Sequence, residues 1–372
     1  MTKRMGLVSA AALVAALIAA PAIGQRPAPA PSGPPSAEAV KDAAAALAAP
    51  RTAPGYVAPR LKIGQPDLQG VWTNASNTNL MRPANFDSLI MSDDEAAKAR
   101  ADNSWNIRLK TDDNQKLSDG LLTGDDLKKG RGYNAFWIDP GNNYANVKGT
   151  WRTSWIVEPA NGQIPYKPEA RKEIRVRRGN GYDNPEERGV GERCLLGFFS
   201  PGGPPLNNGE YNNDYQITQS PNAVVIEAEM AHDARIIPLF KTAAEARAHH
   251  KPPAIKPYMG DSVGWWDGDS LMVETIDMNP EGMGYVKLSP TGKITERFTR
   301  YSAKQILYEF TVDDPATYTQ VWKGEMSLNP SPGIYEYACH EGNYGMVGIL
   351  KGGREADRKG VDNSRPGDRD GG

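Results

Sequence analysis

Two of the four histidines stand beside carboxylates, in groups that could move a proton. His232 directly precedes Asp233, and His340 directly precedes Glu341. A carboxylate can orient an imidazole and tune it for general acid or base work near neutral pH. We therefore predict His340 and His232 as catalytic residues, with Asp233 and Glu341 as their partners. The competing interpretation is that all four are hydrogen-bonded polar residues of turns.

Several polar residues near these histidines could hold a substrate. Arg193 and Arg235 could bind an anionic group or a developing negative charge, because a guanidinium is permanently charged. Asn343 and Tyr344 follow His340 closely and could supply further hydrogen bonds. We predict these four residues as substrate-binding, with paired or turn residues as the alternative.

Acidic residues inside apolar strands suggest a second chemistry. Glu274 and Glu309, and similarly Glu296, interrupt otherwise apolar stretches. Two carboxylates that face one cavity can divide the acid and base roles of glycoside cleavage. Glu274 and Glu309 are therefore further substrate-site candidates, although strand glutamates of this kind commonly face solvent.

The spacing of the potential ligand residues gives less support to a metal or cofactor site. The two histidine–carboxylate pairs have the mixed nitrogen and oxygen donors of a zinc-type site, but neighbours on an extended strand point to opposite faces. Asp261, Asp267 and Asp269 could bind calcium or could form an ordinary hairpin turn. We find no phosphate loop, Cys-x-x-Cys pair or serine nucleophile elbow. We predict no cofactor, with a divalent metal as the minor alternative.

The chain has two cysteines, Cys194 and Cys339. Two distant cysteines in an exported protein indicate a disulfide. Such a bridge would bring Arg193 close to His340. The alternative is a nucleophilic thiol at Cys339.

Asparagine recurs beside aromatic residues. An aromatic ring can stack on the flat face of a sugar or phenol while amides bind its hydroxyls, although the same residue types form turns. The clusters are Tyr133-Asn134, Asn142-Asn143-Tyr144, Tyr182-Asp183-Asn184 and Tyr211-Asn212-Asn213.

The two ends of the chain differ in composition from the middle. Residues 1–24 combine a basic start, a short apolar run and small residues before Gln25, which predicts a cleaved signal peptide and a periplasmic or secreted protein. The alternative is an uncleaved membrane anchor. Residues 25–60 are rich in Pro and Ala and are predicted as a linker in which 36–48 could be a lone helix, and 351–372 as a disordered tail.

The folded part is predicted to be one domain over 61–350. Residues 61–200 form an irregular half, with helices beginning after Ser92 and at Pro168. Residues 201–350 form a strand meander, interrupted by an excursion over 241–268 whose helix begins after Thr242. Short connections favour antiparallel pairing and closure into an up-and-down barrel, with a two-sheet sandwich as the alternative. Period-two alternation places the strands at 215–218, 223–230, 234–240, 270–276, 294–301, 305–312 and 319–328.

Three segments resemble a group of exported bacterial proteins: Pro66-Asp67-Leu68-Gln69-Gly70-Val71-Trp72, the heptapeptide from His232 to Pro238, and the stretch from Tyr335 to Met346. That resemblance implies export and no particular activity. Gly70-Val71-Trp72 also resembles the Gly-x-Trp opening of lipocalin-like barrels, which implies a ligand-holding barrel.

The formal net charge of −2, with both signs interspersed, does not favour nucleic acid or an anionic membrane as a partner, and no oligomeric state is indicated. The partner expected is a small glycan-derived or aromatic compound. The first hypothesis is a cofactor-independent lyase or hydrolase that uses general acid/base chemistry. The second is a barrel-type small-molecule binding protein. The enzyme requires His340 or His232 to line one cavity with Arg193 or Arg235, whereas the binding protein requires a cavity with few titratable groups.

Overall fold

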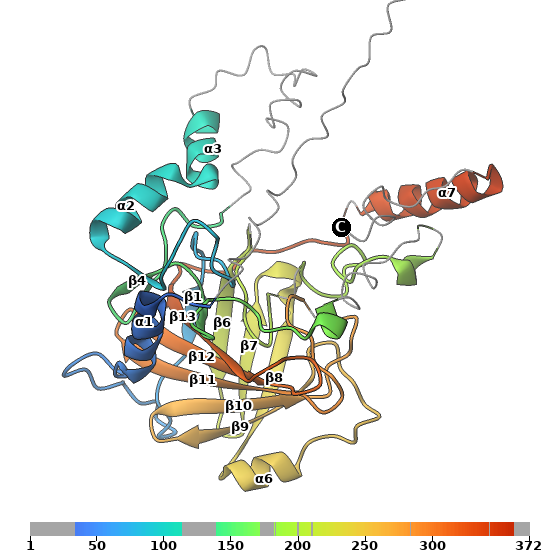
Figure 1. The fold of residues 1–372 in the computed structure, drawn as a ribbon. Coiled ribbons are helices and arrows are strands. Elements are labelled where there is room, and N and C mark those ends of the chain that lie inside the picture. Colours follow the sequence, from blue (N-terminus) through green and yellow to red (C-terminus); the bar gives the residue numbers. More distant parts are fainter. Residues whose placement is uncertain are drawn as a thin grey trace, which may run out of the picture.

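The structure, a computed structural model, describes residues 34–113, 139–171, 182, 184–198, 201–209, 211–282, 284–341 and 343–360. Its body is a closed β-barrel (Figure 1), so the predicted mainly β barrel is confirmed. Nine strands form the barrel, each pairs with the next, and β13 pairs with β1 to close it. In order around the barrel they are β1 (Gly70–Thr73), β6 (Asp214–Gln219), β7 (Ala223–Ala228), β8 (Ala234–Phe240), β9 (Asp261–Asp267), β10 (Ser270–Ile276), β11 (Lys293–Ser302), β12 (Gln305–Asp313) and β13 (Trp322–Pro330).

One junction departs from the predicted up-and-down arrangement. Strands β8 and β9 run parallel, whereas the other neighbours in the barrel are antiparallel. The long excursion explains the difference, because a parallel pair needs a crossover of a dozen or more residues. Strand β9 itself was missed in the sequence because its ends, Asp261 and Asp267, are typical of turns. Gly268 does form the β9–β10 hairpin turn, with a φ of 60°.

The alternation along each strand directs one set of side chains into the barrel. On β12, Ile306, Tyr308, Phe310 and Val312 are fully or almost fully buried. Phe310 lies 5.7 Å from Trp322 of β13, centroid to centroid. Large aromatic and aliphatic side chains therefore fill the barrel interior. The interior of a barrel of this size is thus largely occupied by its own side chains.

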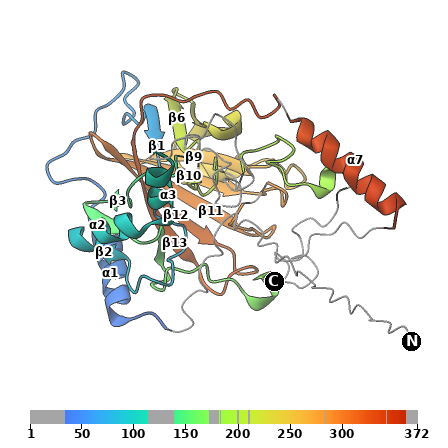
Figure 2. The same ribbon diagram turned by 90° about the horizontal axis from the view of Figure 1, so that it is seen from above.

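Short elements cover parts of the outer surface. Figures 1 and 2 place α1 and α2 on the opposite side of the barrel from α7. The short elements are α1 (Ala37–Ala48), β2 (Ile90–Met91), α2 (Asp93–Asp102), α3 (Ser104–Asp113), β3 (Asn146–Val147), β4 (Thr150–Arg152), β5 (Ile156–Glu158), η2 (Pro185–Glu187), η3 (Met230–His232), α6 (Ala243–Ala248) and α7 (Tyr344–Arg358).

The predicted helix starts are confirmed where the structure describes them. Ser92 forms a capping box with Glu95 at the start of α2, and Thr242 accepts from the Glu245 amide at the start of α6. The chain is helical from Pro168 to Arg171, and the rest of that predicted helix lies outside the described residues.

The predicted linker over 25–60 needs correction from α1 onward. The allowed helix is present, but it packs on the domain: Ala43 and Ala46 are buried in one cluster with Leu89 and Val157. Asp42 also accepts the Ile90 amide at 3.1 Å. Alanine side chains are small enough to let a helix lie close to a sheet. The Ala-rich composition that predicted a linker therefore forms a packed helix in this segment.

The predicted disordered tail over 351–372 also begins too early. Helix α7 continues to Arg358, and Gly353 within it is buried against Tyr182, where a Cβ would lie 2.6 Å from the tyrosine Cβ. Glycine there permits the close approach. The predicted signal peptide over 1–24 and the last twelve residues lie outside the described residues. Among the helices that are described, none is both long and apolar enough to cross a bilayer.

Candidate functional site

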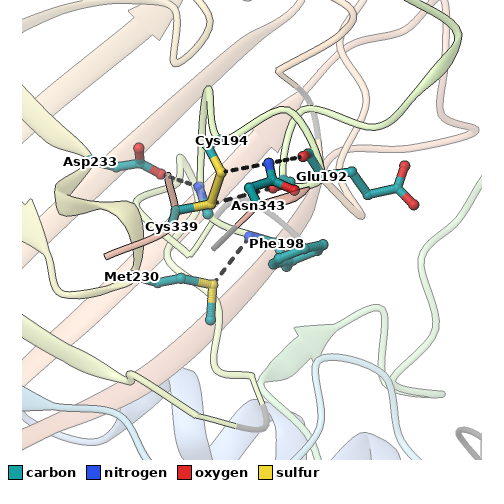
Figure 3. Close-up of a disulfide and its surroundings, with 9 residues drawn as sticks. Glu192, Cys194, Phe198, Met230, Asp233, Cys339 and Asn343 are labelled. Atoms are coloured by element: carbon teal, nitrogen blue, oxygen red, sulfur yellow. Dashed lines mark hydrogen bonds between the residues drawn. A yellow bond between two sulfur atoms is a disulfide. The ribbon is translucent and has the colours of Figure 1, made fainter. Parts of the chain in front are cut away.

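The predicted disulfide is present and joins Cys194 to Cys339 with 5.7 Å between their Cα atoms (Figure 3). Asn343 donates to the Glu192 carbonyl at 3.0 Å and lies 3.4 Å from the Cys194 sulfur. The bridge therefore fixes the segment before α7 to the loop around Cys194.

The predicted catalytic histidines lie in exposed positions. His340 and Glu341 are exposed in the turn that precedes α7, and the Tyr344 side chain is 83% exposed. His232 is exposed as well and has a φ of 54°. These side chains are therefore largely open to solvent.

Asp233 is the buried member of this group. Burial raises its pKa to about 6, although the hydrogen bond from the Gly197 amide and the charge of His232 oppose the shift. The Gly197 nitrogen lies 2.7 Å from Asp233 Oδ2, and Figure 3 shows that bond beside the disulfide. Asp233 thus anchors the loop that carries Cys194.

Arg235 points into the barrel rather than toward either histidine. Its side chain forms a two-point ion pair with Glu296, and Tyr308 donates to the same carboxylate at 2.8 Å. Both partners are almost fully buried. Burial lowers the pKa of Arg235, but Glu296 more than offsets this and holds the pKa above its ordinary value. The guanidinium is occupied by the protein itself.

The other predicted substrate residues have separate partners. Arg193 pairs with Glu281 at 3.2 Å, and Glu309 pairs with Arg51 at 2.7 Å. Glu274 pairs with Arg247 at 3.0 Å beside α6. The structure therefore does not bring Glu274 and Glu309 together as a carboxylate pair.

Sequence reasoning missed the interaction of Glu274 with His250. His250 Nδ1 lies 2.8 Å from Asp261, and its Nε2 lies 3.7 Å from Glu274. Burial lowers the pKa of His250, but the two carboxylates raise it by more. Asp267 and Asp269, the other calcium candidates, pair with Arg297 and Arg60. Within the described ranges, no three His, Cys, Asp or Glu side chains are grouped to hold a metal.

A cavity of about 270 Å³ lies between the barrel surface and the short strands β3 and β4. It is built from segments that are far apart in sequence. The predicted cluster Asn142-Asn143-Tyr144 belongs to its wall. Its lining consists of Asn74, Ala75, Ser76, Gly141, Asn142, Asn143, Tyr144, Ala145, Asn146, Trp151, Gln305, Ser327 and Asn329.

Hydrogen bonds and ring contacts hold the cavity walls. Trp151 donates to Asp93 at 2.7 Å, and Tyr144 packs edge-on against Phe86 with 5.7 Å between centroids. Gly141 has a φ of 82°, and a Cβ there would lie 2.6 Å from the Ser76 nitrogen. Only glycine allows the two loops to approach this closely.

A charged group next to the cavity anchors the short strands on the barrel. Glu325 of β13 binds Lys148 at 2.6 Å and Arg152 at 3.1 Å, and all three side chains are about 2% exposed. Ser327 and Asn329 follow at alternate positions and line the cavity. The ion pairs are thus adjacent to the cavity but are not part of its described lining.

Comparison of the chain with known protein families, curated proteins and solved structures finds no match. A function must therefore be argued from the geometry of the cavity and from the placement of the titratable groups.

Proposed function

We propose that this is an exported binding protein that holds a small, oxygen-rich, glycan-derived molecule in the cavity beside β3 and β4. One observation carries the proposal. The described lining contains five Asn, one Gln and two aromatic residues, and no Asp, Glu, Lys, Arg or His. Amides both donate and accept hydrogen bonds, as ligand hydroxyl and ring oxygens require.

Binding is favoured over lyase or hydrolase chemistry by the placement of the acids and bases. General acid/base catalysis needs a titratable side chain within hydrogen-bond reach of the reacting atoms. His340 and His232 are exposed, and Arg235 is committed to Glu296. Tyr144 is the one titratable side chain in the described lining, and burial raises its pKa further above neutrality.

The dimensions indicate a ligand of about one ring. Pockets for drug-sized molecules span roughly 300 to 1,000 Å³, so a cavity of about 270 Å³ lies just below that range. Tyr144 and Trp151 supply the flat apolar surface that a sugar ring can contact. The disulfide is compatible with export, which the predicted signal peptide requires.

Isothermal titration and ligand-observed NMR with monosaccharides test this proposal. The variant Asn146→Trp should fill the cavity and abolish binding. Its control is Ile236→Trp on β8, where the native side chain is 69% exposed, and this variant should bind like the wild type. Absence of binding by every sugar, or undiminished binding by folded Asn146→Trp protein, would contradict the proposal.

A further inference from the structure

The protein itself fixes the orientation of the Asn329 amide. Gln305 Nε2 donates to the Asn146 carbonyl at 2.9 Å, and Gln305 Oε1 accepts from the Lys148 amide at 3.3 Å. A carbonyl can only accept and a main-chain N–H can only donate, so both ends of Gln305 are assigned. Gln305 Nε2 also donates to Asn329 Oδ1 at 3.3 Å. The oxygen of Asn329 is thereby used, and the side chain presents its NH₂ group.

Asn143 is restricted in the same way. Its Oδ1 accepts from the Tyr144 main-chain N–H at 2.9 Å. That donor cannot act as an acceptor, so the oxygen of Asn143 must face it. The group that remains for a ligand is again the NH₂.

The two serines of the lining extend this bias toward donors. Ser76 Oγ accepts from the Thr78 amide at 3.3 Å, and Ser327 Oγ lies 3.5 Å from Asn329 Nδ2. Each hydroxyl has one acceptor position occupied and keeps its proton for donation. The cavity therefore offers donors from Ser76, Asn143 and Ser327, and one N–H of Asn329, because the other N–H of Asn329 is directed to Ser327. Asn74 is the exception, because its NH₂ group donates to Tyr215 and Met326 and its oxygen is left as an acceptor.

We propose that the ligand of this cavity is a sugar acid whose carboxylate meets the donors of Asn143 and Asn329; this rests on the proposed binding function. A carboxylate has two oxygens with about four lone-pair sites and no proton to donate. Its hydrogen bonds to neutral N–H groups are charge-assisted and stronger than those of a hydroxyl. The described lining has no acidic side chain that would repel it.

Three probes of similar size test the inference by isothermal titration: D-glucuronate, its methyl ester and D-glucose. The carboxylate should bind at least tenfold more tightly than the ester or the neutral sugar, because tenfold corresponds to about 1.4 kcal/mol, the size of one charge-assisted bond.

The matched variants are Asn329→Asp and, as the control, Asn222→Asp. Aspartate at 329 keeps an oxygen for Gln305 but loses the NH₂ donor, so glucuronate affinity should fall more than tenfold. Asn222 is exposed in the turn between β6 and β7, outside the described lining, and the same added charge there should change affinity less than threefold. Should Asn329→Asp misfold, Asn143→Asp makes the same test, because its oxygen can still accept from Tyr144.

The outcomes separate the two proposals. Neutral sugars that bind as tightly as glucuronate would overturn the sugar-acid inference and leave the binding function intact. Equal losses in the 329 and 222 variants would also overturn it. Failure of all three probes to bind wild-type protein would overturn the sugar-acid inference, and failure of every other monosaccharide as well would overturn the binding function.

Discussion

Two polar regions of this protein differ in how completely their groups are paired. Inside the barrel, Arg235, Glu296 and Tyr308 form a buried set in which the carboxylate meets a guanidinium and a phenol, and only Arg235 Nε among the Arg235 nitrogens has no described partner. In the outer cavity, Asn143 and Asn329 use their oxygens within the protein, and Asn329 directs one N–H to Ser327, which leaves its other N–H for the proposed ligand. We therefore place the proposed ligand where hydrogen-bonding capacity remains unused, and not where charge is concentrated.

The largest expected effect comes from breaking the buried set of Arg235, Glu296 and Tyr308. Arg235→Leu leaves Glu296 buried without its cation, and removal of one partner of a buried pair costs about 3–5 kcal/mol. Chemical denaturation should show that loss, while the folded fraction should keep its ligand affinity.

The double variant Arg235→Leu/Glu296→Leu is the control, because it removes both charges. It should recover part of the lost stability. If Arg235→Leu is as stable as the wild type, Arg235 and Glu296 do not form a desolvated ion pair.

Much of the barrel could be predicted because local patterns specify it. Alternation along β12 and the capping box at Ser92 are readable in short windows, and two cysteines allow one pairing. The packing of α1 on the domain and the helix α7 could not be predicted, because tertiary contacts stabilise their Ala- and Gly-rich sequences. The cavity was predictable only at Asn142-Asn143-Tyr144, because its other walls come from distant segments.

Loss of the disulfide should have the next largest effect. Cys194→Ser/Cys339→Ser opens a loop of 145 residues, and removal should lower the free energy of unfolding by about 3 kcal/mol. The bridge holds the segment before α7 and supplies no residue of the cavity lining. Ligand affinity should therefore stay within twofold of the wild type, as measured by isothermal titration. A large loss of affinity in folded protein would show that the two regions are coupled.

Asp233 gives a smaller, pH-dependent effect. Its pKa is about 6 in the folded protein against 3.8 for the ordinary group, so the folded state holds the proton more tightly. The tighter binding of this proton stabilises the folded protein below about pH 4, and this stabilisation is lost as the pH rises to about 6. Asn at this position keeps an oxygen for the Gly197 amide and does not titrate.

The free energy of unfolding of Asp233→Asn, relative to that of the wild type, should therefore rise by about 2 kcal/mol as the pH increases from 4 to 7. Denaturation curves at several pH values measure this difference. The control is Asp269→Asn, because Asp269 is exposed and shows no such burial. A stability difference between Asp233→Asn and the wild type that is independent of pH would contradict the described burial of the carboxyl group.

The smallest expected effect concerns His340, the strongest catalytic candidate in the sequence. Its side chain is exposed in the turn after Cys339 and lies outside the described cavity lining. His340→Gln should change the free energy of unfolding by less than about 0.5 kcal/mol, as expected for an exposed surface residue. Ligand affinity should be unchanged over pH 5–8, since no group in the described lining titrates in that range. If folded His340→Gln protein loses ligand affinity, the ligand binds near the disulfide and not in the amide-lined cavity.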